Sequence, residues 1–531
     1  MLAWVKLELK DAEGFVCVLI WQDYLRRTVK SKTRLRIRTQ ERLRYASVYC
    51  FGFFSLSTRW EIRDRMTKQL QGTYHVNSRG MHWLVAAFFV IGDIAGGGLV
   101  ILSGAIKYTG LFGGIILFFV TMLIASYTAT LLGENWVILQ KKWPEYRTHC
   151  RKPYPEMGYR SLGSVMRKIV SYCVNITQFS VAVVYLLLSA KIFRDSILAT
   201  TGFYINFCFM ILIVATLVLP VTMLKSPQDF WHVVVAAMFS TCIACILIIV
   251  GVSSDYNICM NQAEYPPVNV GGVLIGMGIF FFSYDGHAAF PTIQHDMKEP
   301  QKFGRSVFLA YIVVTLVYMP VSILGYITYG SSIGDCIIGS IQTPWLQMAA
   351  STFIGVHCIL TIVFVLNPLN QEAEECFSLP QSFGIERVVC RSVMMVLVVL
   401  ATASIPNFGP LVNLGGLTVT LTAFVFPCLF NVFLKAQEHQ TEDQIPTLKK
   451  VISSTPKAKL LLIIVLMFFG VIAGTATTYS AIVELSTTHF KMPCYFAPFL
   501  ESNNATAVSN IRCCGPSLNI SSLRTPEVCF A

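Results

Sequence analysis

Polar residues interrupt a long apolar stretch near the middle of the chain. The apolar run that starts at Ile279 stops at five residues and then resumes through Pro291. The five residues are Ser283, Tyr284, Asp285, Gly286 and His287. Hydroxyl, carboxylate and imidazole groups at one place can hydrogen-bond an ammonium group or exchange a proton. We therefore interpret Ser283, Tyr284 and Asp285 as binding residues and His287 as an ion-coupling residue. The competing interpretation is a kinked core helix with a few buried polar side chains.

A second break lies within the first long apolar segment. Asp93 precedes three consecutive glycines, Gly96, Gly97 and Gly98. Without Cβ atoms, a helix can unwind at this point or let another backbone come close. An acid at the centre of a membrane-spanning helix costs at least about 2.5 kcal/mol on insertion scales, so it is a functional candidate by default. The alternative for Asp93 is a structural hydrogen bond to neighbouring backbone.

The composition indicates which elements must position these residues. Of the 531 residues, 54% are hydrophobic and only 13% are charged, and the mean hydropathy is +0.60. A soluble domain has about a quarter charged residues. Apolar runs recur along the chain, each near the ~20 residues that a helix needs to cross the hydrocarbon core. The sequence therefore predicts an all-α polytopic membrane protein.

Eleven membrane spans are predicted. They lie near 83–106, 111–132, 169–192, 203–223, 230–252, 271–293, 305–329, 346–367, 388–405, 409–434 and 460–483. Two prolines around an Asn and a Gly at 405–410 favour a turn between the ninth and tenth spans. The chain then divides into a basic cytosolic N-terminal region, a transmembrane domain and a tail, at 1–82, 83–483 and 484–531.

The distribution of basic residues predicts the orientation. Eleven spans leave 35 of the 41 Lys and Arg residues on the side of the N-terminus, which is therefore expected in the cytosol. An odd number of spans places the tail outside the cell or in a lumen. The tail holds four cysteines and two sequons, at Asn504 and Asn519, which predict glycosylation in an oxidising compartment. The membrane is either the plasma membrane or a lysosomal or vesicular one. We expect the basic N-terminal run to lie against anionic lipid rather than nucleic acid.

The positions of the two breaks predict an inverted repeat. Breaks in spans one and six divide the first ten spans into two halves of five, as in secondary transporters whose site lies between the repeats. Half-helix N-termini present N–H groups to a carboxylate. A zwitterionic amino acid would suit this arrangement, with its carboxylate at Gly96–Gly98 and its amine at the break in span six.

Three segments resemble the amino acid/auxin permease family. Residues 285–303, from Asp-Gly-His-Ala-Ala-Phe-Pro to Glu-Pro-Gln-Lys-Phe, closely resemble its sixth span, and 153–160 and 406–416 resemble other parts of it. The resemblance covers roughly residues 80 to 485. It implies a five-plus-five inverted repeat with one added span, and amino acid transport coupled to protons or sodium. We expect the substrate to be a small neutral amino acid. Some members carry an outer disulfide, so the resemblance also implies a bond between Cys259 and Cys336.

Departures from the family leave the substrate open. The segment 102–105 reads Leu-Ser-Gly-Ala where the family usually has Leu-Pro-Tyr-Ala, and Asp93 is not a general family feature. We expect Asp93, Asp285 and His287 to be the only mid-membrane titratable groups near the two breaks. They favour protons as the coupling ion, with sodium as the alternative.

Other classes of protein fit less well. The sequence has no HExxH, P-loop or GxSxG motif, so we expect neither an enzyme nor a bound cofactor or metal. An amino acid sensor that signals through its N-terminal region would bind substrate without flux. A channel would only equilibrate it, and nothing in the sequence resembles a selectivity filter. The sequence does not predict an oligomeric state.

Overall fold

The structure, a computed structural model, describes residues 75–521 apart from 79, 149, 204, 224–230, 335, 381–383, 405–411, 439–443, 488–493 and 495–512. The described residues form helices and turns, with two isolated β-bridges, between Met81 and Met297 and between Cys514 and Ile520. The all-α prediction is therefore confirmed. Most of the basic N-terminal region and the predicted turn at 405–410 lie outside the described residues.

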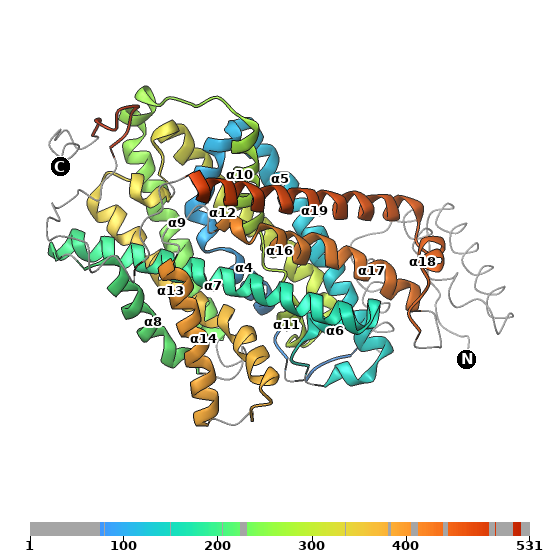
Figure 1. The fold of residues 1–531 in the computed structure, drawn as a ribbon. Coiled ribbons are helices and arrows are strands. Elements are labelled where there is room, and N and C mark those ends of the chain that lie inside the picture. The colour runs from blue at the N-terminus through green and yellow to red at the C-terminus, as the bar shows by residue number, and fades with distance from the viewer. Residues whose placement is uncertain are drawn as a thin grey trace, which may run out of the picture. The chain divides into compact units, whose positions relative to one another are not determined.

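The helices follow one another with short connections (Figure 1). In chain order they are α4 (Trp83–Ile94), α5 (Gly97–Lys142), α6 (Pro153–Leu162), α7 (Ser164–Thr201), α8 (Phe207–Thr222), α9 (Trp231–Cys259), α10 (Val270–Ser283), α11 (Phe290–His295), α12 (Phe303–Tyr329), α13 (Pro344–Cys376), α14 (Ile385–Ser404), α16 (Gly416–Thr420), α17 (Phe426–Gln437), α18 (Leu448–Ser454) and α19 (Lys457–Thr487). Seven helical segments of the described chain are long and apolar enough to cross a membrane, with α16 and α17 joined as one segment (Gly416–Gln437), and α4, α8 and α10 are shorter apolar helices. The protein is thus an integral, multi-pass membrane protein.

Local sequence explains where several helices begin or bend. Gly110 has φ +71°, and this backbone conformation interrupts α5. The interruption lies between the predicted end of the first span and the predicted start of the second. The Asn206 side chain caps α8 by accepting a hydrogen bond from the Cys208 amide, and Asn269 caps α10 in the same way. Gly163, with φ +87°, separates the short helix α6 from α7.

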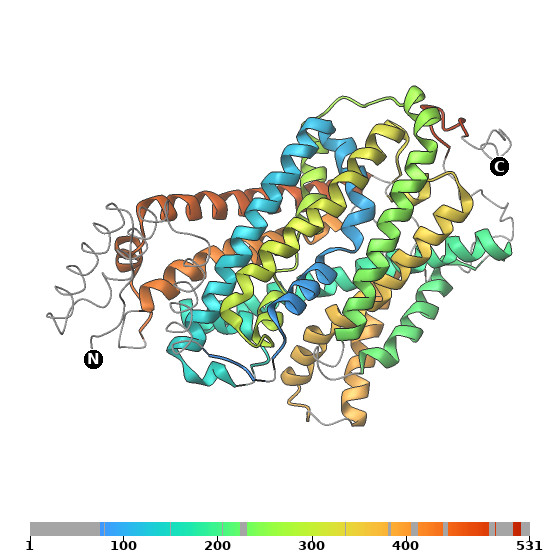
Figure 2. The same cartoon turned by 180° about the vertical axis from the view of Figure 1, so that it is seen from behind.

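Long helices surround the two broken segments. Helix α12 packs against α4, α5 and α9, and α13 packs against α7 and α9, while α10 lies against α5 and α19. The views from front and back show α4 and α10–α11 running inside this set (Figure 2). The backbone freed at each break therefore contacts protein rather than lipid, as a break inside a bilayer requires.

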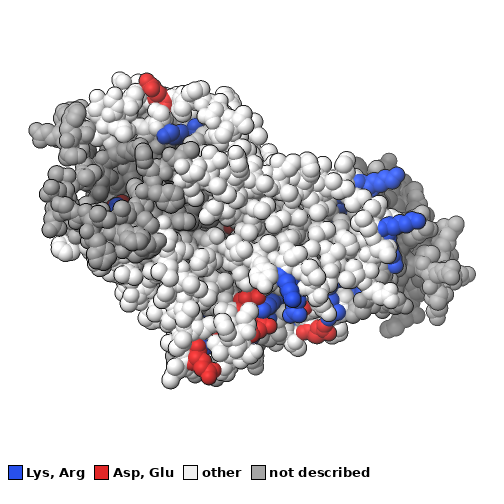
Figure 3. Space-filling view, viewed as in Figure 1, with Lys and Arg blue, Asp and Glu red and all other residues white. Residues whose placement is uncertain are grey.

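Charged side chains lie toward the ends of the helices. A broad uncharged surface covers the face seen in Figure 3, with Lys, Arg, Asp and Glu gathered at its margins. One buried group joins two helices: Glu374 on α13 accepts hydrogen bonds from Arg387 and Arg391 on α14, over 3.0 and 2.6 Å. Helix α14 is not among the seven strongly apolar helices. The two guanidinium groups share one carboxylate, so removing Glu374 would leave two buried positive charges without this partner.

The predicted bond between Cys259 and Cys336 is wrong. Cys259 forms a disulfide with Cys514 of the tail, with the Cα atoms 5.6 Å apart. A second disulfide joins Cys208 at the start of α8 to Cys494, with the Cα atoms 5.3 Å apart. The Gln342 Nε2 group donates to the Ile520 carbonyl over 3.1 Å and so fixes the tail to the segment before α13, while the Cys514 amide donates to the same carbonyl within the tail.

One of the two predicted glycosylation sites can be placed in the structure. Asn519 is exposed and follows the turn that starts at Cys514, so its side chain is open to modification. Asn504 lies outside the described residues. Glycosylation at either site stays a prediction.

Candidate functional site

The first break separates α4 from α5. Helix α4 ends at Ile94, and α5 starts at Gly97 after two residues with non-helical ψ angles, Ala95 at +46° and Gly96 at −98°. The carbonyl of Ile94 accepts hydrogen bonds from the Gly96 amide over 2.8 Å and from the Tyr318 hydroxyl over 2.7 Å. These partners supply the bonds that the interrupted helix can no longer make.

The second break separates α10 from α11. Helix α10 ends at Ser283, whose hydroxyl donates to the Ile279 carbonyl, and α11 starts at Phe290. The Tyr284 carbonyl accepts a hydrogen bond from the Tyr311 hydroxyl over 3.1 Å. Tyr311 and Tyr318 lie two turns apart on α12. One helix therefore satisfies carbonyl groups at both breaks.

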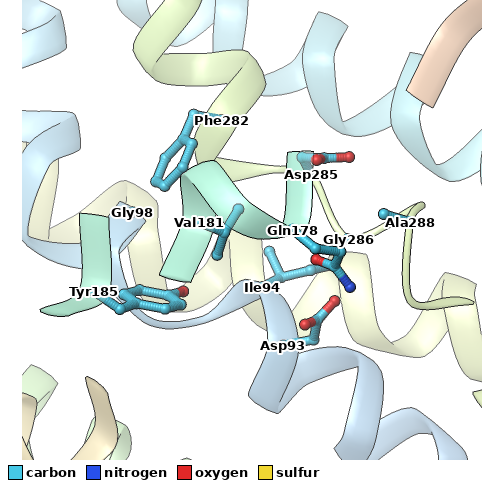
Figure 4. A pocket seen from close by; sticks show the side chains of 10 residues that line it. All are labelled: Asp93, Ile94, Gly98, Gln178, Val181, Tyr185, Phe282, Asp285, Gly286 and Ala288. Carbon is cyan, nitrogen blue, oxygen red and sulfur yellow. The ribbon is translucent and has the colours of Figure 1, made fainter. Parts of the chain in front are cut away.

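The two breaks touch each other. A Cβ atom added to Gly286 would lie 2.8 Å from Asp93 Oδ2, so the Asp93 carboxylate rests against the backbone of the second break. Asp285 comes from the same break and faces the same pocket. The lining residues are Asp93, Ile94, Gly98, Gln178, Val181, Tyr185, Phe282, Asp285, Gly286 and Ala288 (Figure 4). The structure thus brings together two carboxyl groups that are 192 residues apart in the sequence.

The pocket is small, and its lining is acidic. Its volume is about 20 Å³, which is enough for a water molecule but not for an amino acid. The residues that line it include two acids and no Lys or Arg. Gln178 on α7 is 4% exposed, and its Nε2 group has no hydrogen-bond partner in the described part of the chain. In Figure 4 the side chains of Gln178 and Asp93 both reach into the pocket. A buried amide donor without a partner indicates space for a ligand.

The predicted binding residues occupy different places. Asp285 and Gly98 line the pocket, whereas Gly97 is not among the lining residues and lies against the ring of Tyr185. Gly96 packs between Tyr185 and His357. Ser283 and Tyr284 are buried next to the pocket without being among its lining residues. The Tyr284 hydroxyl instead shares a 2.9 Å hydrogen bond with Thr315.

The two predicted ion-coupling residues separate. Asp93 lines the pocket. His287 is fully buried and turns toward α5, where its Nε2 lies 3.1 Å from the Thr128 hydroxyl and 3.2 Å from the Ala125 carbonyl. Its Nδ1 lies 3.5 Å from Asp285 Oδ1. Among the described residues, Nδ1 has no hydrogen-bond partner. His287 thus lies outside the pocket lining, and its role in ion coupling stays a prediction.

Sequence reasoning missed three polar residues around the breaks. Gln178 and Tyr185 come from α7, and His357 comes from α13. The expectation that the acids and His287 are the only titratable residues near the breaks is therefore wrong. Each missed residue was visible as a polar position inside a predicted span. The sequence, however, contains no pattern that predicts which break each of these residues contacts.

Comparisons with known proteins identify the family of this chain. Residues 79–480 match the family of transmembrane amino acid transporter proteins. The amino acid transporter AVT1B of Arabidopsis thaliana is 24% identical over 406 residues, which cover 74% of this chain and 69% of that protein. The transporter AVT1J of the same organism is 26% identical over 317 residues, covering 58% and 74%. The structure of MhsT in complex with L-phenylalanine covers 76% of this chain and all of its own, with a TM-score of 0.46 at 14% identity.

The family match also bears on the class of protein. Its members are transporters, which confirms the expectation that the chain is not an enzyme. Because a single family model spans most of the chain, this protein belongs to the transmembrane amino acid transporter family.

Proposed function

We propose that the chain is a secondary active transporter that moves a small neutral amino acid by alternating access, coupled to protons. The proposal rests on the pocket at the two breaks, which is lined by Asp93, Asp285 and Gln178, whose amide Nε2 has no partner among the described residues. Carboxylates suit the ammonium group of an amino acid. The Gln178 amide and the backbone N–H groups at the start of α5 suit its carboxylate.

A count of charges supports proton coupling. Two carboxyl groups share one small pocket without a basic residue in its lining, and like charges in such a site disfavour each other. A neutral amino acid is a zwitterion without net charge, so its ammonium group can pair with one of the two acids while uncharged donors hold its carboxylate. A proton on Asp93 then removes the charge of the other acid. A sodium ion could replace the proton, and that alternative is decided by experiment.

The size of the pocket supports alternating access. A cavity of about 20 Å³ cannot hold an amino acid, so α4 and α10 must move apart before substrate enters. Breaks in helices are suitable hinges for this motion, since their backbone is not held by helical hydrogen bonds. The eleven spans and the five-plus-five inverted repeat belong to the same proposal.

The proposed orientation has a cytosolic N-terminus and an extracellular or lumenal tail, in the plasma membrane or a vesicular membrane. Two disulfides support it, because Cys494 and Cys514 tie the tail to the ends of α8 and α9 that border loops poor in basic residues. The partners in this proposal are the amino acid and the lipid bilayer.

Uptake by reconstituted protein tests the function. Purified protein in proteoliposomes is offered a panel of radiolabelled L-amino acids, with an inward pH gradient, with a sodium gradient, or with neither. We expect accumulation of a neutral amino acid that follows the pH gradient. Binding without flux would indicate a sensor, and equilibration without accumulation would indicate a channel. Accumulation that requires sodium would replace the proton in the proposal.

A variant of one pocket acid tests the coupling. Asp93→Asn keeps the size of the side chain but cannot carry the coupling proton. We expect it to exchange internal for external substrate while losing pH-driven accumulation. If Asp93→Asn accumulates substrate as the wild type does, Asp93 is not the coupling site.

A further inference from the structure

A buried histidine lies against the break between α4 and α5. His357 is on α13 and is fully buried. A Cβ atom added to Gly96 would lie only 2.3 Å from His357 Nε2, so the imidazole touches the unwound backbone itself. Gly96 follows the last residue of α4 by two positions. The ring therefore sits at the end of α4 that carries the negative pole of the helix dipole.

The hydrogen-bond partners of His357 fit both of its protonation states. Nδ1 lies 3.1 Å from the Ala237 carbonyl, which can only accept, so Nδ1 carries a hydrogen. Nε2 lies 3.1 Å from the Thr361 hydroxyl. That hydroxyl also lies 2.9 Å from the His357 carbonyl. It can donate to a neutral ring, or it can turn to the carbonyl and accept from a protonated one.

The surroundings of the ring are mostly uncharged. On α9, Ala237 and Thr241 supply oxygens, and the Thr241 hydroxyl lies 2.8 Å from Nδ1. On α7, the ring of Tyr185 lies 6.3 Å from the imidazole. On α4, Asp93 is the charged residue of this region, and it shares the pocket wall with Tyr185. On α13 itself, the titratable neighbour in sequence is Cys358. The described residues place no Lys or Arg in an ion pair with this ring.

We propose that His357 is a second proton-binding site, separate from the acid pair, and that its protonation controls how readily the break between α4 and α5 rearranges. A protonated ring uses the Thr361 hydroxyl as an acceptor and is attracted to the end of α4, which holds the break in its present geometry. A neutral ring loses that attraction. The inference rests on the proposed function, because it concerns the rate at which a transporter changes conformation.

Exchange at equal pH on both sides of the membrane separates this site from the coupling site. Proteoliposomes are loaded with the amino acid that the wild type transports best, and exchange is measured from roughly pH 4 to 8, which covers the spread of histidine titration in folded proteins. We expect the wild-type exchange rate to change with pH. We expect His357→Gln to lose the part of the pH dependence that Asp93→Asn retains, while its pH-gradient-driven accumulation persists because Asp93 is intact.

Two further variants complete the test. Thr361→Val keeps the imidazole but removes the hydroxyl that serves both protonation states, so it should also lose this part of the pH dependence of exchange. His82→Gln, at the cap of α4, changes a histidine outside the site and should keep the wild-type profile. If His357→Gln does not exchange at all, the pH profile of exchange by Thr361→Val decides whether the inference holds.

The outcomes distinguish the inference from the proposed function. A wild-type pH profile in His357→Gln or in Thr361→Val would overturn the inference and leave proton-coupled transport standing. A wild type whose exchange does not depend on pH would overturn it as well. Loss of accumulation together with loss of pH dependence in His357→Gln would assign the coupling proton itself to His357 and overturn its separation from the acid pair. Absence of uptake by the wild type would instead refute the proposed function.

Discussion

Two tyrosines on α12 offer a direct test of how the breaks are held. The Tyr311 hydroxyl is the donor that we find for the Tyr284 carbonyl, so Tyr311→Phe leaves a buried carbonyl without that bond, at a cost of about 1–3 kcal/mol. The Ile94 carbonyl keeps its bond to the Gly96 amide when Tyr318 is changed to Phe. That change costs the net value of one hydrogen bond, about 0.5–1.5 kcal/mol. Both variants keep the aromatic ring in place.

The assay is the rate at which exchange activity in proteoliposomes is lost at one elevated temperature. If the bonds are broken in the transition state of inactivation, a loss of about 1–3 kcal/mol speeds inactivation roughly 5- to 150-fold. The corresponding figure for Tyr318→Phe is roughly 2- to 10-fold. Tyr326→Phe, near the end of the same helix, is the matched control, and we expect no change because its ring packs against Tyr265 without a hydrogen bond from its hydroxyl among the described contacts. Equal effects of Tyr311→Phe and Tyr318→Phe, or a larger effect of Tyr318→Phe, would refute the reasoning.

Three further predictions follow from packing and covalent structure. A methyl group at Gly98 would lie 2.6 Å from the Tyr318 hydroxyl, whereas one at Gly97 would lie 3.3 Å from its nearest neighbour. At equal surface expression, Gly98→Ala should therefore abolish amino acid uptake and Gly97→Ala should keep most of it. The reverse order of uptake would contradict this packing. Cys514→Ser should shift the chain on a non-reducing gel and lower uptake as Cys259→Ser does, and matching loss in Cys336→Ser alone would contradict the observed pairing. Burial raises the pKa of the Cys150 thiol to about 12. Because only the thiolate reacts with maleimide, Cys150 should resist labelling at pH 7 until the protein is denatured. Rapid labelling of Cys150 in the folded protein would contradict this prediction.

Much of the fold and part of the site could be predicted from local signals. An apolar run long enough to cross a bilayer forms a helix whatever surrounds it, so the all-α class and most helix positions follow from composition and spacing. The breaks at 92–98 and 283–287 are also local, since glycines and polar side chains within a span weaken the helix where they occur. Asp93 and Asp285 stood out for this reason, and both line the pocket.

Contacts between distant segments of the chain are determined only by the tertiary structure. Gln178 enters the pocket from α7, and His357 reaches the first break from α13, although each looks like an ordinary polar residue in its own span. Cys259 has several possible partners in the sequence, and the path of the tail selects Cys514. His287 stands two residues from Asp285, yet it faces α5 because the unwound chain turns it away from the pocket. Such pairings depend on how helices pack against one another, and a chain carries no local pattern that specifies them.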